Sequence, residues 1–356
     1  MGERENAITR KLTVALIGCG GMGGTHNLAL KALSDEMDVE MIAIADCREE
    51  CLEKGAAVWP GVHKYGTGME LLENESPDIV HICLPSYLHA DHAVRAMKKG
   101  CHVFIEKPVC LSKEEGELLL QTQRETGVKV MVGQVVRSFA EYRYLKEIYE
   151  KQTYGKLKSV VMQRLSRKAA WGFENWFMDE EKSGSVVLDL HIHDLDFLRY
   201  MLGEPDSFTV KAASFDTGLI NQVITDYQFK DIFAVAEGLW DVSPAVAFEP
   251  SFRASFEEAT VIYNGTKDPA LLVYEKDGKV FAPELKKDDQ MQDAVSGINL
   301  SDLGPYYTEI RYFLECLRSG KEMRRAPLEE GVKSVLLGLE ELEAAREYIK
   351  GHKSNG

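Results

Sequence analysis

Short apolar runs alternate with amphipathic stretches through the first third of the chain. The runs LTVALIG (12–18) and VEMIAIAD (39–46) predict buried strands, and the stretch 21–35 between them has apolar residues at helical spacing. Further strands are expected over 77–85, 101–108 and 128–134, and further helices over 48–58, 89–100 and 112–127. Short apolar strands that alternate with helices need crossover connections, so the pattern predicts a parallel, doubly wound sheet.

The pattern changes after about residue 132. A predicted helix over 139–155 precedes a strand over 156–166, an aromatic loop and a helix-periodic stretch over 185–203. Strand-like runs without a long helix fill 207–285, with a hairpin turn expected at 277–279 and two late helices near 305–319 and 327–350. We therefore predict a doubly wound α/β domain over 1–132, and an α+β domain over 133–356 with a mostly antiparallel open sheet flanked by helices.

Composition and charge exclude several classes of protein. The 356 residues carry 42 Lys and Arg against 57 Asp and Glu, a net charge of −15, so no nucleic-acid partner is expected. No apolar run approaches the roughly 18 residues that cross a bilayer, and the polar N-terminus predicts no secretory leader. The seven cysteines are an odd number, and several lie in apolar runs; we interpret them as reduced thiols of a cytoplasmic protein.

The sequence Gly18-Cys19-Gly20-Gly21-Met22-Gly23 fits G-x-G-x-x-G, with a predicted strand before it and a predicted helix after it. The first glycine would make the sharp turn, the second would let a pyrophosphate approach, and the third would let the helix pack closely on the strand. The phosphates would then meet the N–H groups at the positive end of the helix. The context favours a Rossmann dinucleotide-binding domain over the alternative of a merely flexible turn.

Asp46 ends the second predicted strand, 23 residues beyond Gly23. A carboxylate at this spacing accepts hydrogen bonds from the ribose hydroxyls and repels a 2′-phosphate, which favours NAD over NADP. Arg48 lies two residues on and would offset that repulsion, so NADP stays open as an alternative cofactor. The competing interpretation of Asp46 is a turn residue at a strand end.

Two further strand ends carry polar motifs, Leu84-Pro85-Ser86 with His89 opening the next helix, and Glu106-Lys107-Pro108. Both should lie at the carboxyl edge of the sheet, where ligands bind in open α/β folds. Lys107 would then point toward the nicotinamide, the alternative being a solvated lysine at a strand end. The expected cofactor contacts are Gly18, Gly20, Gly21, Met22, Gly23, Asp46, Arg48, Leu84, Pro85, Ser86, His89, Glu106 and Lys107.

The segment SVVLDLHIHDLDFLRYMLG (185–203) places Asp189 and His193 four residues apart, on one face of the predicted helix. His191 falls nearly opposite His193, so a metal site built from both histidines fails on geometry unless the helix is locally unwound. We predict no metal. The remaining alternative for His193 is a hydrogen-bonded core histidine.

GCGGMG, LPSYLH, EKP and the later D-x-x-x-H together resemble the glucose–fructose oxidoreductase, inositol dehydrogenase and MocA-like (Gfo/Idh/MocA) family, in motif order over roughly 12–345. The resemblance implies that Lys107 reaches the substrate oxygen beside the nicotinamide. It also implies that Asp189 and His193 lie beside the substrate, with His193 as proton acceptor.

The chain departs from the family pattern in places. Ser183-Gly184-Ser185 stands where many members have three glycines, and the stretch around Arg137 matches loosely. Arg137 and Trp176 are expected substrate contacts, and aromatic faces such as that of Trp176 suit sugar rings or act as apolar plugs.

The resulting hypothesis is an NAD(P)-dependent dehydrogenase acting on a ring secondary alcohol of a cyclic polyol, sugar or glycoside. One alternative is a redox-neutral enzyme that keeps its NAD bound while it transiently oxidises a sugar or glycoside. Another is a non-enzymatic NAD-binding redox sensor, which would need none of Lys107, Asp189 and His193. The exposed sheet face of the second domain, together with fold-level analogy, predicts a homo-oligomer, either a dimer or a tetramer.

Overall fold

The computed structural model describes residues 10–215, 218–285 and 304–353, which divide into two compact units. The first unit holds 10–138 and 304–333, and the second holds 139–215, 218–285 and 334–353. The sequence predicted a single boundary near residue 132. In the structure the helix α9 (Gly304–Ser319) groups with the first unit, so the chain crosses between the units more than once.

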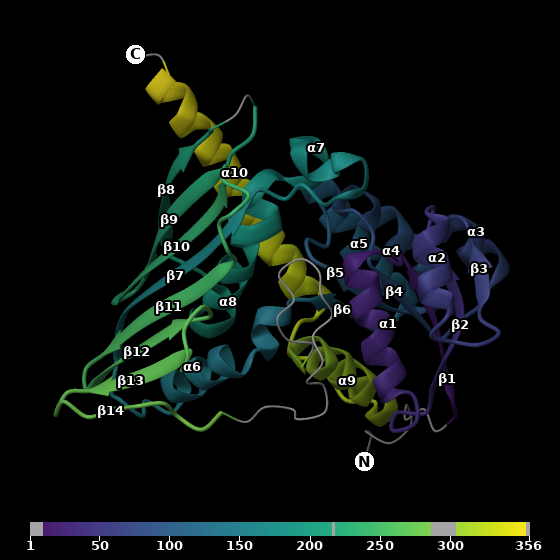
Figure 1. Ribbon diagram of the computed structural model, residues 1–356, viewed down its shortest axis with the longest axis horizontal. Helices are drawn as coiled ribbons and strands as arrows, with labels where there is room; N and C mark the ends of the chain where they lie inside the picture. Colours follow the sequence, from purple (N-terminus) through teal and green to yellow (C-terminus); the bar gives the residue numbers. More distant parts are fainter. Residues whose placement is uncertain (1–9, 216–217, 286–303, 354–356) are drawn as a thin grey trace. The chain divides into compact units, whose positions relative to one another are not determined.

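The first unit is built on a six-stranded, wholly parallel sheet in the order β3-β2-β1-β4-β5-β6 (Figure 1). Its strands are β1 (Leu12–Ile17), β2 (Val39–Ala45), β3 (His63–Tyr65), β4 (Ile79–Ile82), β5 (His102–Glu106) and β6 (Val130–Gly133). This order reverses between β1 and β4, which makes the carboxyl ends of those strands the ligand-binding edge of such a sheet. The predicted doubly wound fold is confirmed.

Helices complete the first unit: α1 (Gly21–Leu33), α2 (Glu49–Ala56), α3 (Gly68–Asn74), α4 (His89–Lys98), α5 (Lys113–Thr126) and α9. The α5 boundaries follow from local chemistry, because Ser112 Oγ accepts the N–H of Glu115 at 3.1 Å and Gly127 ends the helix at φ 68°. The core lies between β1, α1 and α9, where Leu16, Leu30 and Phe313 are 0–1% exposed.

The second unit carries an eight-stranded sheet in the order β14-β13-β12-β11-β7-β10-β9-β8. Its strands are β7 (Leu157–Arg167), β8 (Ser207–Ala213), β9 (Gln222–Phe229), β10 (Ile232–Asp241), β11 (Glu249–Phe256), β12 (Ala259–Asn264), β13 (Leu271–Glu275) and β14 (Val280–Phe281). All neighbours pair antiparallel except β7 with β10, which confirms a mostly antiparallel sheet.

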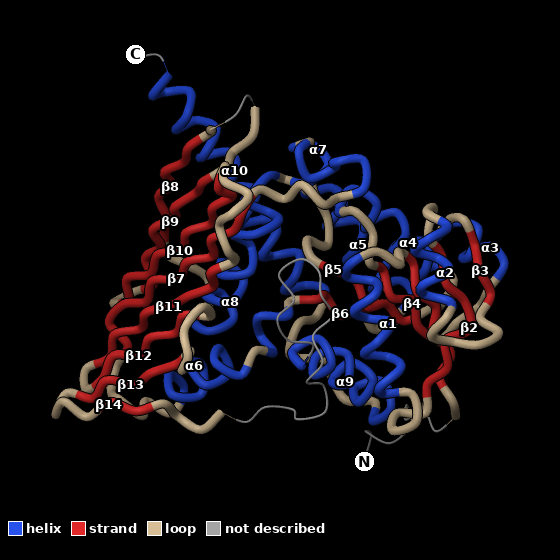
Figure 2. The backbone as a smooth tube through the Cα atoms, viewed as in Figure 1, coloured by secondary structure: helices blue, strands red, loops and turns tan. Residues whose placement is uncertain are grey.

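The helices of the second unit are α6 (Ala140–Glu150), α7 (Glu180–Ser183), α8 (Ile192–Leu202) and α10 (Leu328–Lys353), the last continuing from the first unit. Figure 2 shows α6, α8 and α10 on one face of the sheet. On the strand positions that face away from them, Phe233 and Tyr274 are 44% and 38% exposed. The predicted helix over 139–155 was too long: it ends at Glu150, and a turn with positive φ at Gln152 and Gly155 follows.

Among the residues that the structure describes, no helix is both long and apolar enough to cross a bilayer.

Candidate functional site

Two glycines of the loop between β1 and α1 are required by packing. Gly18 has φ 90°, and a Cβ there would lie 2.4 Å from the carbonyl oxygen of Cys83. A Cβ on Gly23 would lie only 1.8 Å from the carbonyl oxygen of Gly18. A Cβ on Gly20 would instead meet the flexible end of the Arg48 side chain, 2.7 Å away. The first and third glycines therefore have the turn and packing roles expected from the motif.

The N-terminus of α1 fits an anionic ligand. Its N-cap is Gly20, which makes no side-chain cap, and its first turn holds no acidic residue. The first N–H groups of a helix lack partners within the helix and form the positive end of its dipole. Gly20, Gly21 and Met22, which are half-buried or exposed, therefore fit the pyrophosphate of a dinucleotide.

Asp46 lies beside this loop and is 7% exposed. Its Oδ2 accepts the N–H of Cys19 at 2.8 Å, and its Oδ1 accepts the N–H of Arg48 at 2.8 Å. The Arg48 guanidinium adds contacts of 3.1 and 3.2 Å to the two oxygens, and these contacts raise the pKa of Arg48. Both oxygens of the carboxylate already accept hydrogen bonds from these donors. Ribose hydroxyls would therefore bind Asp46 by displacing the half-buried Arg48 side chain.

His89 ties together the two loops that carry the other predicted cofactor contacts. Its Nε2 lies 2.7 Å from the carbonyl oxygen of Leu84, and its Nδ1 lies 2.7 Å from that of Pro108. Two carbonyl acceptors favour a doubly protonated ring, whereas burial lowers the pKa of His89. The structure therefore gives His89 a contact between the loops; a direct cofactor contact by this residue stays a prediction, as it does for Leu84, Pro85 and Ser86.

Lys107 follows β5 and is the one half-buried residue in the otherwise buried stretch 103–110. Its neighbour Glu106 is buried, and the Glu106 carboxylate is turned to His26 on α1, with Nε2 to Oε1 at 2.9 Å. Glu106 Oε2 accepts the backbone N–H of Lys107 at 3.3 Å. Glu106 thus binds protein groups, and the cofactor contact predicted for it stays a prediction.

In the second unit, Asp189 and His193 stand out by exposure. Every residue from Ser183 to Arg199 is buried except these two, which are half-buried. The segment is a π-helical turn, Val187–His191, that leads into α8, and it follows Ser185, whose φ is 57°. Wide turns of this kind recur at functional sites. The two predicted catalytic residues of this unit are therefore the ones that the fold leaves accessible.

His191, which was considered above as a metal ligand, takes part in a buried hydrogen-bond cluster. Its ring is fully buried, and Nε2 lies 2.8 Å from Glu341 Oε2 and 3.1 Å from the Tyr227 hydroxyl. Thr225 and Tyr227 also donate to Glu341, at 3.0 and 2.6 Å. Gly238 on β10 allows this approach, since a Cβ there would lie 2.8 Å from the His191 Cβ.

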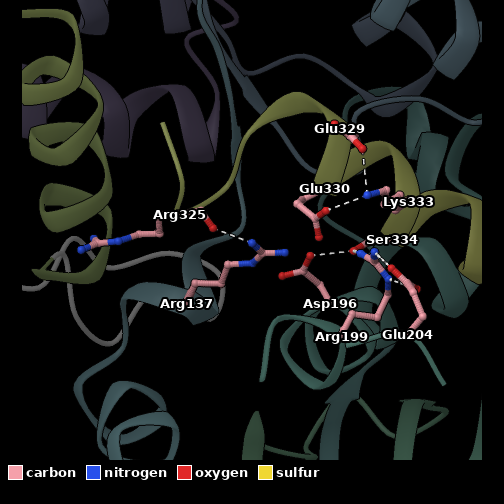
Figure 3. A network of polar contacts seen from close by, with 9 residues as sticks. All are labelled: Arg137, Asp196, Arg199, Glu204, Arg325, Glu329, Glu330, Lys333 and Ser334. Atoms are coloured by element: carbon pink, nitrogen blue, oxygen red, sulfur yellow. Dashed lines mark hydrogen bonds and ion pairs between the residues drawn. The ribbon is translucent and has the colours of Figure 1, made fainter. Parts of the chain in front are cut away.

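Further buried contacts hold α8 in place. Arg164 on β7 pairs with Asp194 through both carboxylate oxygens, at 2.7 and 3.1 Å. Ser334 on α10 donates to Asp196 at 2.7 Å and accepts from Arg199 at 2.7 Å (Figure 3). Neither of these pairings nor the Glu341 cluster was found from the sequence, because their partners are distant in the chain.

The two predicted substrate contacts have different environments. Arg137 is 2% exposed and donates to the carbonyl oxygen of Arg325 within the first unit (Figure 3). Trp176 is half-buried in the second unit and stacks on Phe177 with ring centroids 3.8 Å apart. Substrate binding by either residue stays a prediction.

Two family models match consecutive segments of the chain. Residues 12–134 match the family described as "Oxidoreductase family, NAD-binding Rossmann fold", and residues 142–264 match the "GFO/IDH/MocA C-terminal domain". The chain is 28% identical over 205 residues to the D-glucoside 3-dehydrogenase of Escherichia coli (strain K12), covering 57% of this chain and 58% of that one. It is 30% identical over 194 residues to the myo-inositol 2-dehydrogenase of Thermotoga maritima, covering 54% of this chain and 55% of that one.

The matched stretches thus span little more than half the length of these curated relatives. Among solved structures, a levoglucosan dehydrogenase in complex with NADH superimposes with a TM-score of 0.82 at 19% identity, over 95% of this chain and 98% of that one. That likeness shows the fold alone. The two family matches, in the order and over the segments where the two folds occur, establish that the chain belongs to the Gfo/Idh/MocA family of oxidoreductases with an NAD-binding Rossmann domain.

Proposed function

We propose that the protein is an NAD-dependent dehydrogenase that oxidises a secondary alcohol on the ring of a sugar, cyclic polyol or glycoside. The observation that carries the proposal is the selective exposure of Asp189 and His193 within an otherwise buried helical segment. The names of the relatives, a glucoside 3-dehydrogenase and a myo-inositol 2-dehydrogenase, support the substrate class.

NAD, when bound, supplies the hydride acceptor for the alcohol carbon. His193 accepts the hydroxyl proton, since an imidazole titrates near neutral pH and so serves in both directions. Asp189 hydrogen-bonds the substrate or orients His193. Lys107 places its ammonium group at the oxygen of the reacting substrate alcohol and stabilises the negative charge that develops on that oxygen. Arg137 and Trp176 are proposed as further substrate contacts.

The cofactor preference follows from Asp46. A buried carboxylate beside the glycine loop accepts ribose hydroxyls and repels a 2′-phosphate, so we propose that NAD is preferred. Arg48 pairs with both Asp46 oxygens, and when displaced it would meet a 2′-phosphate, which leaves NADP as the weaker alternative. We also propose a homo-oligomer, because exposed aromatic side chains such as Phe233 and Tyr274 lie on the uncovered side of the strands.

The test is NADH formation on a panel of myo-inositol, methyl glucosides and levoglucosan, with Lys107→Met and His193→Asn as the variants. Lys113→Met is the matched control, because that lysine side chain is 68% exposed at the start of α5. Wild type and control should reduce NAD with at least one compound, and both site variants should lose the activity. NAD that stays bound through desalting without net NADH would favour the redox-neutral alternative, and NAD binding without any turnover would favour the redox sensor.

A further inference from the structure

Four buried titratable side chains inside the first unit have no part in the proposed reaction. They are His26 on α1, His81 on β4, Glu106 at the end of β5 and Glu309 on α9, and none is more than 6% exposed. Aromatic rings enclose them: His81 stacks on Phe104 with centroids 5.0 Å apart and meets the edge of Phe313 at 6.3 Å. Burying polar groups among apolar side chains costs free energy unless each donor has a hydrogen-bond acceptor.

The contacts form a series of hydrogen bonds that ends at the backbone N–H of Lys107. The Nδ1 atoms of His81 and His26 are 3.0 Å apart, and His26 Nε2 lies 2.9 Å from Glu106 Oε1. Glu106 Oε2 then accepts the backbone N–H of Lys107. Gly133 on β6 makes room for this carboxylate, because a Cβ there would lie 2.8 Å from Glu106 Oε1.

The hydrogen-bond geometry places the protons on the histidines. Only one of the two facing Nδ1 atoms can donate, and His81 Nε2 has no partner among the described residues. A proton on His81 Nε2 would be a buried donor without an acceptor, so the proton belongs on His81 Nδ1. His26 Nδ1 then accepts it, and His26 Nε2–H donates to Glu106. Glu106 Oε1 therefore accepts a hydrogen bond from His26 Nε2–H. A charged carboxylate has no proton of its own to donate, so this arrangement suits the charged form of Glu106.

Glu309 completes the group from α9. One of its oxygens lies within 4.8 Å of the His26 and Glu106 ligand atoms, yet neither oxygen has a hydrogen-bond partner among the described residues. Burial and the charge of Glu106 raise the pKa of Glu309 well above its ordinary value, opposed by Arg325. A further charged residue near α9 is Arg137, whose turn packs on that helix and whose guanidinium binds the Arg325 carbonyl. Two carboxylates so close in an apolar interior do not both ionise.

We propose that Glu106 is charged and Glu309 protonated, and that with His26 and His81 they form a buried network that positions Lys107. The functional part of this proposal rests on the proposed role of Lys107. The network holds Glu106 from one side through His26, so that its other oxygen fixes the backbone N–H of Lys107 at the end of β5. The Glu106 and Glu309 ligand atoms lie within 4.8 Å of each other, a span that one bridging water covers.

The two glutamates should respond differently to the same isosteric change. Glu309→Gln mimics a neutral carboxylic acid, so NAD affinity and kcat should stay within about threefold of wild type. Glu106→Gln turns an NH₂ group toward either His26 Nε2–H or the Lys107 N–H, so kcat should fall at least about tenfold. Equal losses of kcat in both variants, or none in Glu106→Gln, would overturn the positioning role.

A pH-dependent unfolding experiment tests the proton assignment without turnover. A carboxyl group whose pKa is raised by folding keeps a proton that the unfolded chain releases above about pH 4.5, so its contribution to stability is lost as the pH rises. The unfolding constant of wild type, divided by that of Glu309→Gln, should therefore rise by up to about tenfold per pH unit above that value. A ratio that does not change between about pH 5 and pH 8 would overturn the assignment, whether or not any sugar is oxidised.

Metal analysis separates this network from a cation site made of the same atoms, since His26, Glu106 and Glu309 have suitable ligand types. Wild type dialysed against chelator should keep its unfolding midpoint and contain no stoichiometric divalent metal. A stoichiometric metal that is present in wild type and absent from Glu309→Gln would overturn the proposal.

Discussion

Replacing Glu341 by leucine would remove the acceptor of three buried hydrogen bonds in the second unit. His191, Thr225 and Tyr227 donate to this carboxylate at 2.8, 3.0 and 2.6 Å, and all four side chains are at most 1% exposed. A buried donor that loses its acceptor costs about 1–3 kcal/mol. Thr225 and Tyr227 lose theirs outright, for about 2–6 kcal/mol, whereas His191 Nε2 keeps the Tyr227 hydroxyl at 3.1 Å. The carboxylate no longer has to be buried, which offsets part of this cost and leaves a net loss of about 2–4 kcal/mol.

The same change should reach the candidate site, because His191 closes the π-helical turn that carries Asp189. We expect kcat to fall by about tenfold or more, equivalent to about 1.4 kcal/mol of transition-state stabilisation. The control is Glu343→Leu on the same helix, where the side chain is exposed and the effect should stay within about 0.5 kcal/mol.

Urea unfolding followed by far-ultraviolet circular dichroism measures the loss, and a double-mutant cycle tests its cause. Tyr227→Phe should destabilise wild type by about 1 kcal/mol, because it removes a hydrogen bond to Glu341. In the Glu341→Leu background the same substitution should change stability by less than about 0.5 kcal/mol, because it removes a donor that has lost its acceptor but also the hydroxyl that His191 Nε2 still contacts. Additive effects of the two substitutions would refute the reasoning.

Three further predictions follow from the first unit. Gly23→Ala should weaken NAD binding by at least about tenfold, because its Cβ would overlap the Gly18 carbonyl, whereas Gly24→Ala, with open space at its Cβ, should bind NAD like wild type in the same titration. Asp46→Ser should lower the ratio of NAD to NADP affinity by at least about tenfold, and an unchanged ratio would show that Asp46 does not discriminate. Burial lowers the pKa of His92, so on acidification the unfolded chain binds a proton before the folded protein does, and stability is lost as the pH falls below about 6.5. In urea melts, the unfolding constant of wild type divided by that of His92→Asn should therefore rise as the pH falls. A ratio that does not change with pH would contradict this prediction.

The parts of the fold that the sequence predicted are those that local chemistry determines. Ser112 and Gly127 bound α5 because a side-chain cap and a left-handed residue act on neighbouring backbone groups. The strands β1, β2 and β4 were found because a strand buried on both faces is almost continuously apolar. The short strand β3, with exposed polar residues, carries no such signal and was missed.

The candidate site divides in the same way. Gly18, Gly23 and Asp46 belong to one motif, so their places at the loop between β1 and α1 follow from the backbone geometry of a βαβ unit. The groups that support the site come from distant segments: His26 and Glu106 are 80 residues apart, and His191 and Glu341 are 150 apart. Hydrophobic periodicity predicts which face of a helix is buried, but it does not specify which polar side chains meet inside the core. His26 therefore had no assigned role until its contacts with His81 and Glu106 were known.

The most direct test of the proposed function is a comparison of NADH formation by wild type, Lys107→Met and His193→Asn on the sugar and polyol panel. We predict that wild type reduces NAD with at least one ring alcohol, and that each variant loses at least about a hundredfold in kcat while it still binds NAD. Wild-type rates retained in Lys107→Met and His193→Asn would contradict the assignment of these residues to the reaction.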